Sequence, residues 1–215
     1  MKLRHITALA LASWFLMTPA SSLTAADKST LLTYANKAYG FSFQYPSDCT
    51  LTEGAQVKLD WGYLGPVGDS LVYGVTVAAV ELPYGPYRET DFGMAFLKVS
   101  VDTSLNSPRK CNRSAFHGLG PVQRKPGKFP TVKIGENLFT EAIEENAGLG
   151  HDSSAQYYHT LRNSTCYEFQ LGLGTNSAGG ERKQVDQDVV FRRLKAILAT
   201  VTLPHTTGNS PLGGS

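Results

Sequence analysis

The sequence has few of the features that mark membrane-spanning, hydrolytic or nucleotide-binding proteins. Its longest apolar run, residues 6–17, has 12 residues, whereas a helix needs about 20 apolar residues to cross a bilayer. No Gly-x-Ser-x-Gly elbow occurs, so the usual signature of an α/β-hydrolase nucleophile is missing. Residues 118–128 contain glycines and lysines but lack the Gly-Lys-Ser/Thr ending of a phosphate-binding loop. We therefore expect no catalytic constellation, no cofactor and no enzyme activity.

Cysteine is also scarce. The chain has only Cys49, Cys111 and Cys166, and it has no Cys-x-x-Cys pair. Cys49 alternates with Leu51, which predicts a small buried apolar side chain. In an oxidising compartment, three cysteines favour one disulfide and one leftover thiol. We favour the pair Cys111–Cys166, but the sequence alone leaves the pairing open, and a lone cysteine is more often inert than catalytic.

The N-terminal segment has the layout of an export signal. Lys2 and Arg4 precede the apolar run, Pro19 ends it, and small residues lead to Ala25 and Ala26. That order is typical of a secretory signal peptide, here residues 1–25, cleaved after Ala25 or Ala26. We therefore expect an exported protein, periplasmic or secreted, with no transmembrane segment after cleavage.

The charge balance and the length indicate a single neutral domain. Without Lys2 and Arg4, 18 basic side chains stand against 18 acidic ones, and such a balance disfavours nucleic-acid binding. About 190 residues remain after cleavage, enough to bury one core. We expect one domain over residues 30–203, a disordered tail over residues 204–215, and a monomer.

Most of the periodic segments predict strands. In residues 40–46, alternation places Phe41, Phe43 and Tyr45 on one face. Residues 71–82 are apolar on both faces, which predicts a strand in the middle of a sheet, covered on both sides. Residues 155–174 predict two antiparallel strands joined at 162–165.

Helical patterns are fewer. Residues 184–201 carry an apolar stripe at helical spacing, with aspartates near the start and basic residues later. Weaker signals suggest a short helix or a lead-in segment at residues 30–38, and a short helix at 89–95 before a strand at 96–102. Successive strands with few helices between them predict an α+β fold. We expect a single antiparallel β-sheet with the C-terminal helix and the shorter helical pieces packed on it.

Two groups of residues are candidates for binding. His151, Asp152 and His159 lie within nine residues and can supply nitrogen and oxygen ligands to a metal such as Zn²⁺. Their spacing matches no compact metal motif, so this metal-binding protein or metal-dependent enzyme is the alternative function. Glu141, Glu144 and Glu145 more simply form a solvated strand edge.

The second candidate group lies in residues 103–135, which hold seven lysines or arginines and no acidic residue. We interpret this segment as a long basic surface loop that is functional or mobile. Its cations can dock on an acidic protein, an anionic lipid surface or a polyanion, or can simply form a solvated face. The partner-binding candidates are Arg109, Lys110, Arg113, Arg124, Lys125 and Lys128.

Both ends of the predicted domain resemble a known family. "YANKAYGFSFQYPSD" at residues 34–48 and "VFRRLKAILATVTL" at residues 190–203 resemble the opening strand and closing helix of bacterial PsbP-like proteins. Residues 91–111 and 157–169 resemble a group of uncharacterised exported bacterial proteins. The resemblance implies an antiparallel sheet between helices, an α-β-α sandwich. It also implies a small non-enzymatic binding or assembly-assisting module of the cell envelope, and no catalytic residue carries over.

Overall fold

The fold is known from a computed structural model, which covers most of the predicted domain. It describes residues 30–59, 74–114, 130–148, 151–176 and 182–205. The predicted signal peptide and residues 206–215 of the predicted tail lie outside these ranges.

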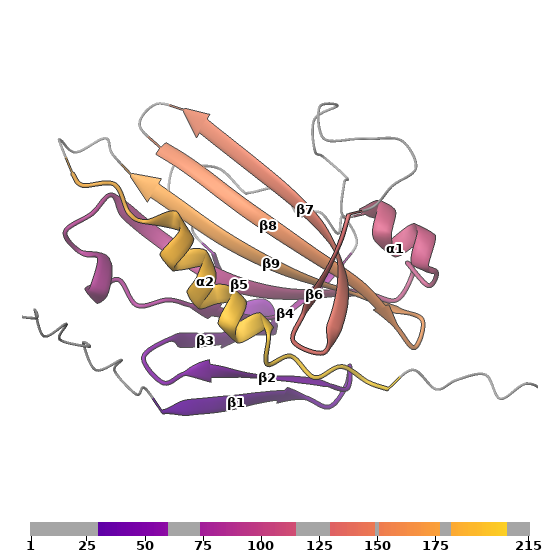
Figure 1. Cartoon of the computed structure of the whole chain (residues 1–215). Helices are drawn as coiled ribbons and strands as arrows, with labels where there is room; N and C mark the ends of the chain where they lie inside the picture. Colours follow the sequence, from indigo (N-terminus) through magenta and orange to yellow (C-terminus); the bar gives the residue numbers. More distant parts are fainter. Residues whose placement is uncertain (1–29, 60–73, 115–129, 149–150, 177–181, 206–215) are drawn as a thin grey trace, which may run out of the picture.

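Antiparallel strands make up most of the described chain and form two sheets (Figure 1). The larger sheet has seven strands in the order β3-β4-β5-β9-β8-β7-β6. Its strands are β3 (Thr50–Glu53), β4 (Val75–Glu81), β5 (Phe92–Asp102), β6 (Thr131–Ile134), β7 (Asn137–Gly148), β8 (His151–Arg162) and β9 (Thr165–Asn176). The smaller sheet is the hairpin of β1 (Leu31–Asn36) and β2 (Phe41–Pro46). The prediction of a single sheet is therefore wrong, because β2 pairs with β1 and, through Ser42, with Thr202 rather than with the large sheet.

Two α-helices of the described ranges accompany the sheets, namely α1 (Pro108–Ser114) and α2 (Gln187–Leu198), with 3-10 turns at Gly54–Gln56 and Gly85–Tyr87. The helices predicted at residues 30–38 and 89–95 are wrong. The first segment is β1, which hydrogen-bonds along β2, and the second leads into β5, which pairs with β9 from Phe92 onward. Pairing between strands outweighs a weak local helical preference.

Residues 103–135 were also misread as one structureless loop. Helix α1 lies near its start and strand β6 near its end, and residues 115–129 lie outside the described residues. The predicted strand at residues 71–82 corresponds to β4, which lies second from one edge rather than at the centre. The central strand is β9, and it is buried along almost all of its length.

The apolar core lies between the large sheet, α2 and the β1–β2 hairpin (Figure 1). Phe41, Phe43 and Tyr45 are buried in it, as the alternation predicts. The predicted stripe of α2 is buried too, with Leu194 and Leu198 fully enclosed. The side chain of Asp186 caps α2 by accepting a hydrogen bond from the Val189 amide at 3.1 Å.

Two tight turns set the register of the strands that they join. Asn163 and Ser164 join β8 to β9 with φ values of 45° and 60°, as a two-residue hairpin turn requires. Gly135, between β6 and β7, has a φ of 57°, and a Cβ there would lie 2.2 Å from the Ala199 carbonyl oxygen. Only glycine allows that approach.

Alternation along β9 separates the two faces of the large sheet. Tyr167, Phe169 and Leu171 belong to the apolar core beneath α2. Cys166 and Glu168 point to the opposite face, where they meet α1 and β8. This second face is largely polar and yet buried, and it contains the candidate site.

Candidate functional site

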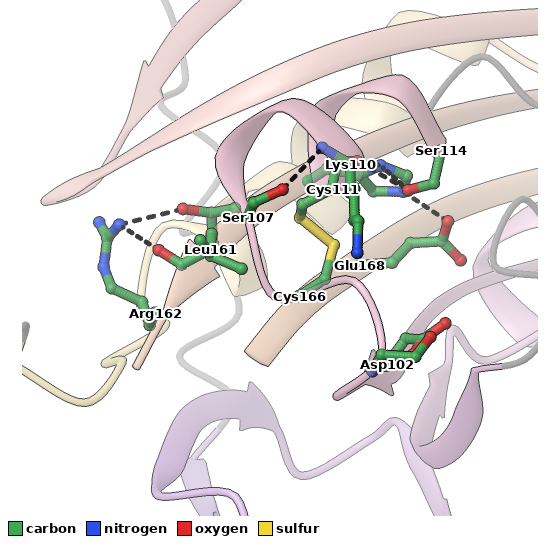
Figure 2. Close-up of a disulfide and its surroundings, with 12 residues drawn as sticks. Asp102, Ser107, Lys110, Cys111, Ser114, Leu161, Arg162, Cys166 and Glu168 are labelled. Atoms are coloured by element: carbon green, nitrogen blue, oxygen red, sulfur yellow. Dashed lines mark hydrogen bonds and ion pairs between the residues drawn. A yellow bond between two sulfur atoms is a disulfide. The ribbon is translucent and has the colours of Figure 1, made fainter. Parts of the chain in front are cut away.

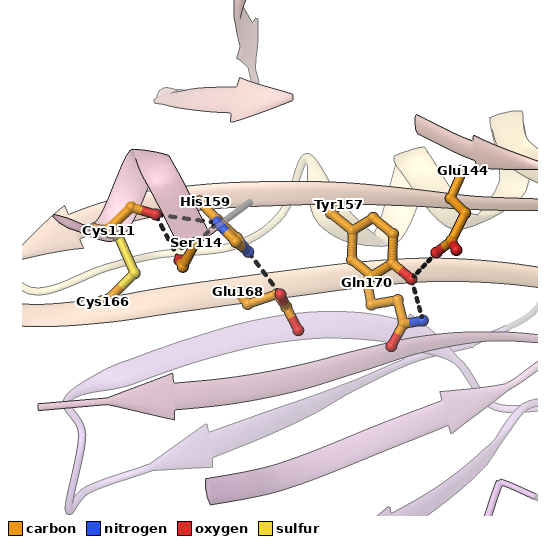
Figure 3. A network of polar contacts seen from close by, with 8 residues as sticks. All are labelled: Cys111, Ser114, Glu144, Tyr157, His159, Cys166, Glu168 and Gln170. Atoms are coloured by element: carbon orange, nitrogen blue, oxygen red, sulfur yellow. Dashed lines mark hydrogen bonds and ion pairs between the residues drawn. A yellow bond between two sulfur atoms is a disulfide. The ribbon is translucent and has the colours of Figure 1, made fainter. Parts of the chain in front are cut away.

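The candidate site is a row of polar side chains on β8 and β9 beneath α1, which we call the polar face (Figure 3). His159 lies opposite Glu168, and Tyr157 lies opposite Gln170, in the antiparallel pairing of the two strands. All four are almost completely buried. Buried polar groups are costly unless they are hydrogen-bonded, so their contacts decide what this face can do.

His159 is held by contacts at both ring nitrogens. Its Nε2 lies 2.6 Å from Glu168 Oε2, and its Nδ1 lies 3.2 Å from the Cys111 carbonyl oxygen. A carbonyl oxygen only accepts hydrogen bonds, so Nδ1 must carry a proton. The Nε2 contact is then either an imidazolium–carboxylate pair or a neutral imidazole that accepts from a carboxylic acid. In both states the ring is fixed between α1 and β9.

Ser114 completes a set of serine, histidine and glutamate that is similar in composition to a hydrolytic triad. Its Oγ donates to the Cys111 carbonyl oxygen at 2.7 Å and lies 3.4 Å from His159 Nδ1. Because Nδ1 already carries a proton, it cannot accept the proton of Ser114, as activation of a nucleophile requires. The geometry therefore orients α1 on the sheet rather than activating a serine.

A second chain of contacts runs along the same face (Figure 3). The Tyr157 hydroxyl donates to Glu144 Oε2 at 2.9 Å, and Gln170 Nε2 donates to that hydroxyl at 3.4 Å. The buried Gln170 Oε1 has no hydrogen-bond partner among the described residues. An unsatisfied buried acceptor costs about 1–3 kcal/mol, so this oxygen is a place where a water molecule or another donor would bind.

A disulfide holds α1 on this face (Figure 2). Cys111 on α1 is bonded to Cys166 at the start of β9, which confirms the predicted pair. Cys111 lies on a helix rather than in a loop. Cys49 is free and buried, as predicted. Burial raises the pKa of the Cys49 thiol to about 11, with a further contribution from Asp48, so the thiol is protonated and weakly nucleophilic at neutral pH.

The predicted basic residues divide into two groups. Arg109, Lys110 and Arg113 lie on α1 and are exposed. They form no salt bridge with any residue in the described ranges. Arg124, Lys125 and Lys128 lie outside those ranges. The three cations on α1, which we call the basic helix surface, are thus exposed on a helix that the disulfide ties to β9.

The structure separates the predicted metal ligands. His151, Asp152 and His159 all lie on β8, and eight residues of strand place the two histidines about 26 Å apart. Both ring nitrogens of His159 also form contacts already, with the Glu168 carboxyl group and the Cys111 carbonyl oxygen. No group of three or more histidine, cysteine or acidic residues gathers within the described ranges in a way that could hold a metal ion. One metal ion cannot bind both histidines, so this prediction is wrong.

The pair His159–Glu168 was missed at the sequence level, although a signal for it exists. A hairpin joined at 162–165 pairs Arg162 with Thr165, and the same register places His159 opposite Glu168. The pair can therefore be predicted by counting three residues away from the turn on each strand, from Arg162 to His159 and from Thr165 to Glu168. Ser114 had no such signal, because its contact with His159 spans 45 residues.

No helix within the described ranges is both long and apolar enough to span a bilayer.

Comparison with known proteins places the chain near two solved structures. No protein-family model matches it, and no curated protein matches its sequence. A crystal structure from Bacteroides thetaiotaomicron VPI-5482 is similar, with a TM-score of 0.44 and 14% identity over 80% of this chain and 48% of that one. The solution structure of cyanobacterial PsbP (CyanoP) from Synechocystis sp. PCC 6803 is also similar. Its TM-score is 0.39, with 10% identity over 87% of this chain and 100% of that chain.

The chain thus spans about half the length of the Bacteroides protein. Its structural neighbours include a PsbP protein, the family that both ends of the sequence resemble.

Proposed function

We propose that the protein is an exported, non-enzymatic binding module of the cell envelope that docks on an acidic protein partner through the basic helix surface. The observation that carries the proposal is the arrangement of α1. Its exposed residues Arg109, Lys110 and Arg113 have no acidic counterpart on the helix. The disulfide and the His159 contact hold the helix in one position on the sheet.

Rigid presentation matters because ordering a flexible segment costs conformational entropy on binding. A helix already held at both Cys111 and Ser114 avoids most of that cost. Three cations on one short helix also attract an acidic surface over a distance of about 10 Å at moderate salt. These properties suit a docking element better than a catalytic one.

Three further features support export without catalysis. The pattern of residues 1–25 is that of a signal peptide, and a disulfide persists in oxidising compartments. His159 has both ring nitrogens engaged, so it is not available as a general base. The signal-peptide part of the proposal has its own check, since mass spectrometry of the exported protein should give an N-terminus at Ala26 or Asp27.

The docking proposal is tested by charge reversal combined with crosslinking in the native host. A photocrosslinking residue at Asn112 of α1 should form a specific protein adduct in the envelope. The variant R109E/K110E/R113E should lose that adduct. The matched control K37E/K58E/R192E changes the net charge equally at exposed sites on other elements and should retain it. An adduct that survives in both variants, or no adduct at all, would overturn docking through α1.

A further inference from the structure

A cleft of about 420 Å³ opens at the end of the large sheet that lies away from α1. It is lined by β7, β8, β9 and the first residue of α2, and about 30 Å of strand separates it from the disulfide. Ligand pockets in proteins commonly measure about 300–1,000 Å³. The cleft is therefore large enough for a small organic molecule and much larger than a bare ion requires.

Strand register places five of the lining side chains on one face. Glu145 pairs with Ser154, and Ser154 pairs with Leu173. Two residues further along each strand, at the next position on the same face, Asp152 pairs with Thr175. Residues directly opposite one another on paired strands point to the same side. The floor is thus the apolar Leu173, and the walls carry two carboxylates, the hydroxyls of Ser154 and Thr175 and the amide of Gln187, with Ser153 as a further lining residue.

Among the described residues, the cleft carries negative charge without a compensating cation. No basic residue of the described ranges lines it, and neither Glu145 nor Asp152 forms a salt bridge within those ranges. A helix N-terminus usually attracts anions. Here the side chain of Asp186 already accepts a hydrogen bond from the Val189 amide. Asp188 adds a second carboxylate to the first turn. The start of α2 therefore does not make an anion site.

Ser154 points independently to a ligand. Its side chain is only 8% exposed, yet it lines the cleft, and its hydroxyl forms no hydrogen bond with any residue in the described ranges. Thr175 is also buried, and its hydroxyl reaches only the Asp152 carbonyl oxygen, at 3.5 Å. Both hydroxyls belong to residues that line the cleft, so a polar group bound there would exchange hydrogen bonds with them.

We infer that this cleft binds a small organic cation carrying a primary ammonium or guanidinium group. Glu145 and Asp152 would accept the charged hydrogen bonds, Ser154 and Thr175 would accept or donate further bonds, and Leu173 would contact the aliphatic part. Two carboxylates are too few to replace the six to eight oxygen ligands that Ca²⁺ takes. They suit the three donors of an ammonium group or the fork of a guanidinium.

The test is an NMR titration of the full mature protein with 1,4-diaminobutane, agmatine and the peptide Gly-Arg-Gly. We expect saturable amide shifts at residues 152–154 and 173–175. The variant E145Q/D152N should bind at least tenfold more weakly, and Ser154→Ala a few-fold more weakly. The matched control E53Q/E89Q removes two exposed carboxylates elsewhere and should bind within twofold of the unsubstituted protein.

The outcomes are distinct. Binding of the free amines without the peptide assigns the site to a soluble cation, and binding of the peptide at least as tightly assigns it to a basic side chain of another protein. Both results support the cation site. Equal binding by E145Q/D152N and E53Q/E89Q, shifts produced by Ca²⁺ or glucose instead of the amines, or no saturable shift would overturn it. Thermal unfolding of each variant confirms that it is folded, and none of these results depends on docking through α1.

Discussion

The two faces of the seven-stranded sheet are both buried, but by different chemistry. The face beneath α2 and the β1–β2 hairpin is apolar and aromatic, and its fully buried side chains include Phe43, Phe169, Leu171, Leu194 and Leu198. The opposite face carries buried polar side chains, including Lys98, Ser100, His159, Glu168 and Gln170. The same strands supply both faces, since successive residues of a strand point in opposite directions.

The difference lies in how each face stabilises the fold. On the apolar face, each side chain contributes roughly in proportion to the area it removes from water. On the polar face, a group contributes only while its partner is in place, because a buried charge or hydrogen-bonding group left alone is costly. The loss of unfolding free energy should therefore depend on the buried area removed on the apolar face, and on the partner left behind on the polar face.

The largest effect is expected on the apolar face, from Phe169→Ala. Phe169 is fully buried and contacts Phe41 and Phe139 edge-on, with ring centroids 6.4 and 5.7 Å away. Removing the ring should lower the free energy of unfolding by about 4 kcal/mol, measured by urea unfolding. Leu138→Ala, at a side chain that is 57% exposed, should change it by less than about 0.5 kcal/mol. Equal losses of unfolding free energy in the two variants would show that Phe169 is not buried in the apolar core.

Removal of the disulfide should have the next largest effect. The double variant C111A/C166A should lose about 3 kcal/mol of stability, since the bond closes a long loop with a sequence separation of 55 residues. Hydrogen exchange should rise in α1 more than in α2, because α1 rests on few other contacts. Uniform exchange in both helices would contradict the assigned role of the disulfide in holding α1.

The hydrogen-bonded pair of His159 and Glu168 on the polar face should show coupling between two substitutions. Glu168→Gln and His159→Asn should each lower the free energy of unfolding by about 2 kcal/mol, because each leaves a buried partner unpaired. The double variant should cost clearly less than the sum of the two single variants. A double-mutant cycle by urea unfolding measures this difference, and strict additivity would show that the two side chains do not interact.

The smallest effect is expected from Cys49→Ala. Cys49 lies on the apolar side of the molecule and is free, in contrast to the bonded pair beneath α1. Its sulfur makes one weak contact, 3.6 Å from Asp48 Oδ1. The substitution should cost about 1 kcal/mol, read from the same unfolding curves. A loss as large as that of C111A/C166A would show that Cys49 has a structural role beyond packing.

Much of the apolar face was predictable, because its signals are local. Alternation over residues 41–45 and helical spacing over residues 190–201 each identify a buried face from near neighbours in the chain. The β8–β9 hairpin was predictable for the same reason, and its register already contains the pair of His159 and Glu168. The polar face was missed because a charged or amide side chain in a strand normally signals solvent rather than burial.

Residues close together in the chain are enough to predict the alternating strands, the amphipathic C-terminal helix and the candidate cysteines. The remaining features depend on contacts between distant segments. Residues 31–36 form a strand because they pair with β2. Strand β9 is central because of the order of the sheet. The carbonyl oxygen of Cys111 on α1 contacts His159, which lies 48 residues later in the chain. The tertiary structure also brings Gln187 to Glu145 and Asp152 at the cleft. Contacts of this kind join segments far apart in the chain, and their free energy exceeds the local preferences that a sequence displays.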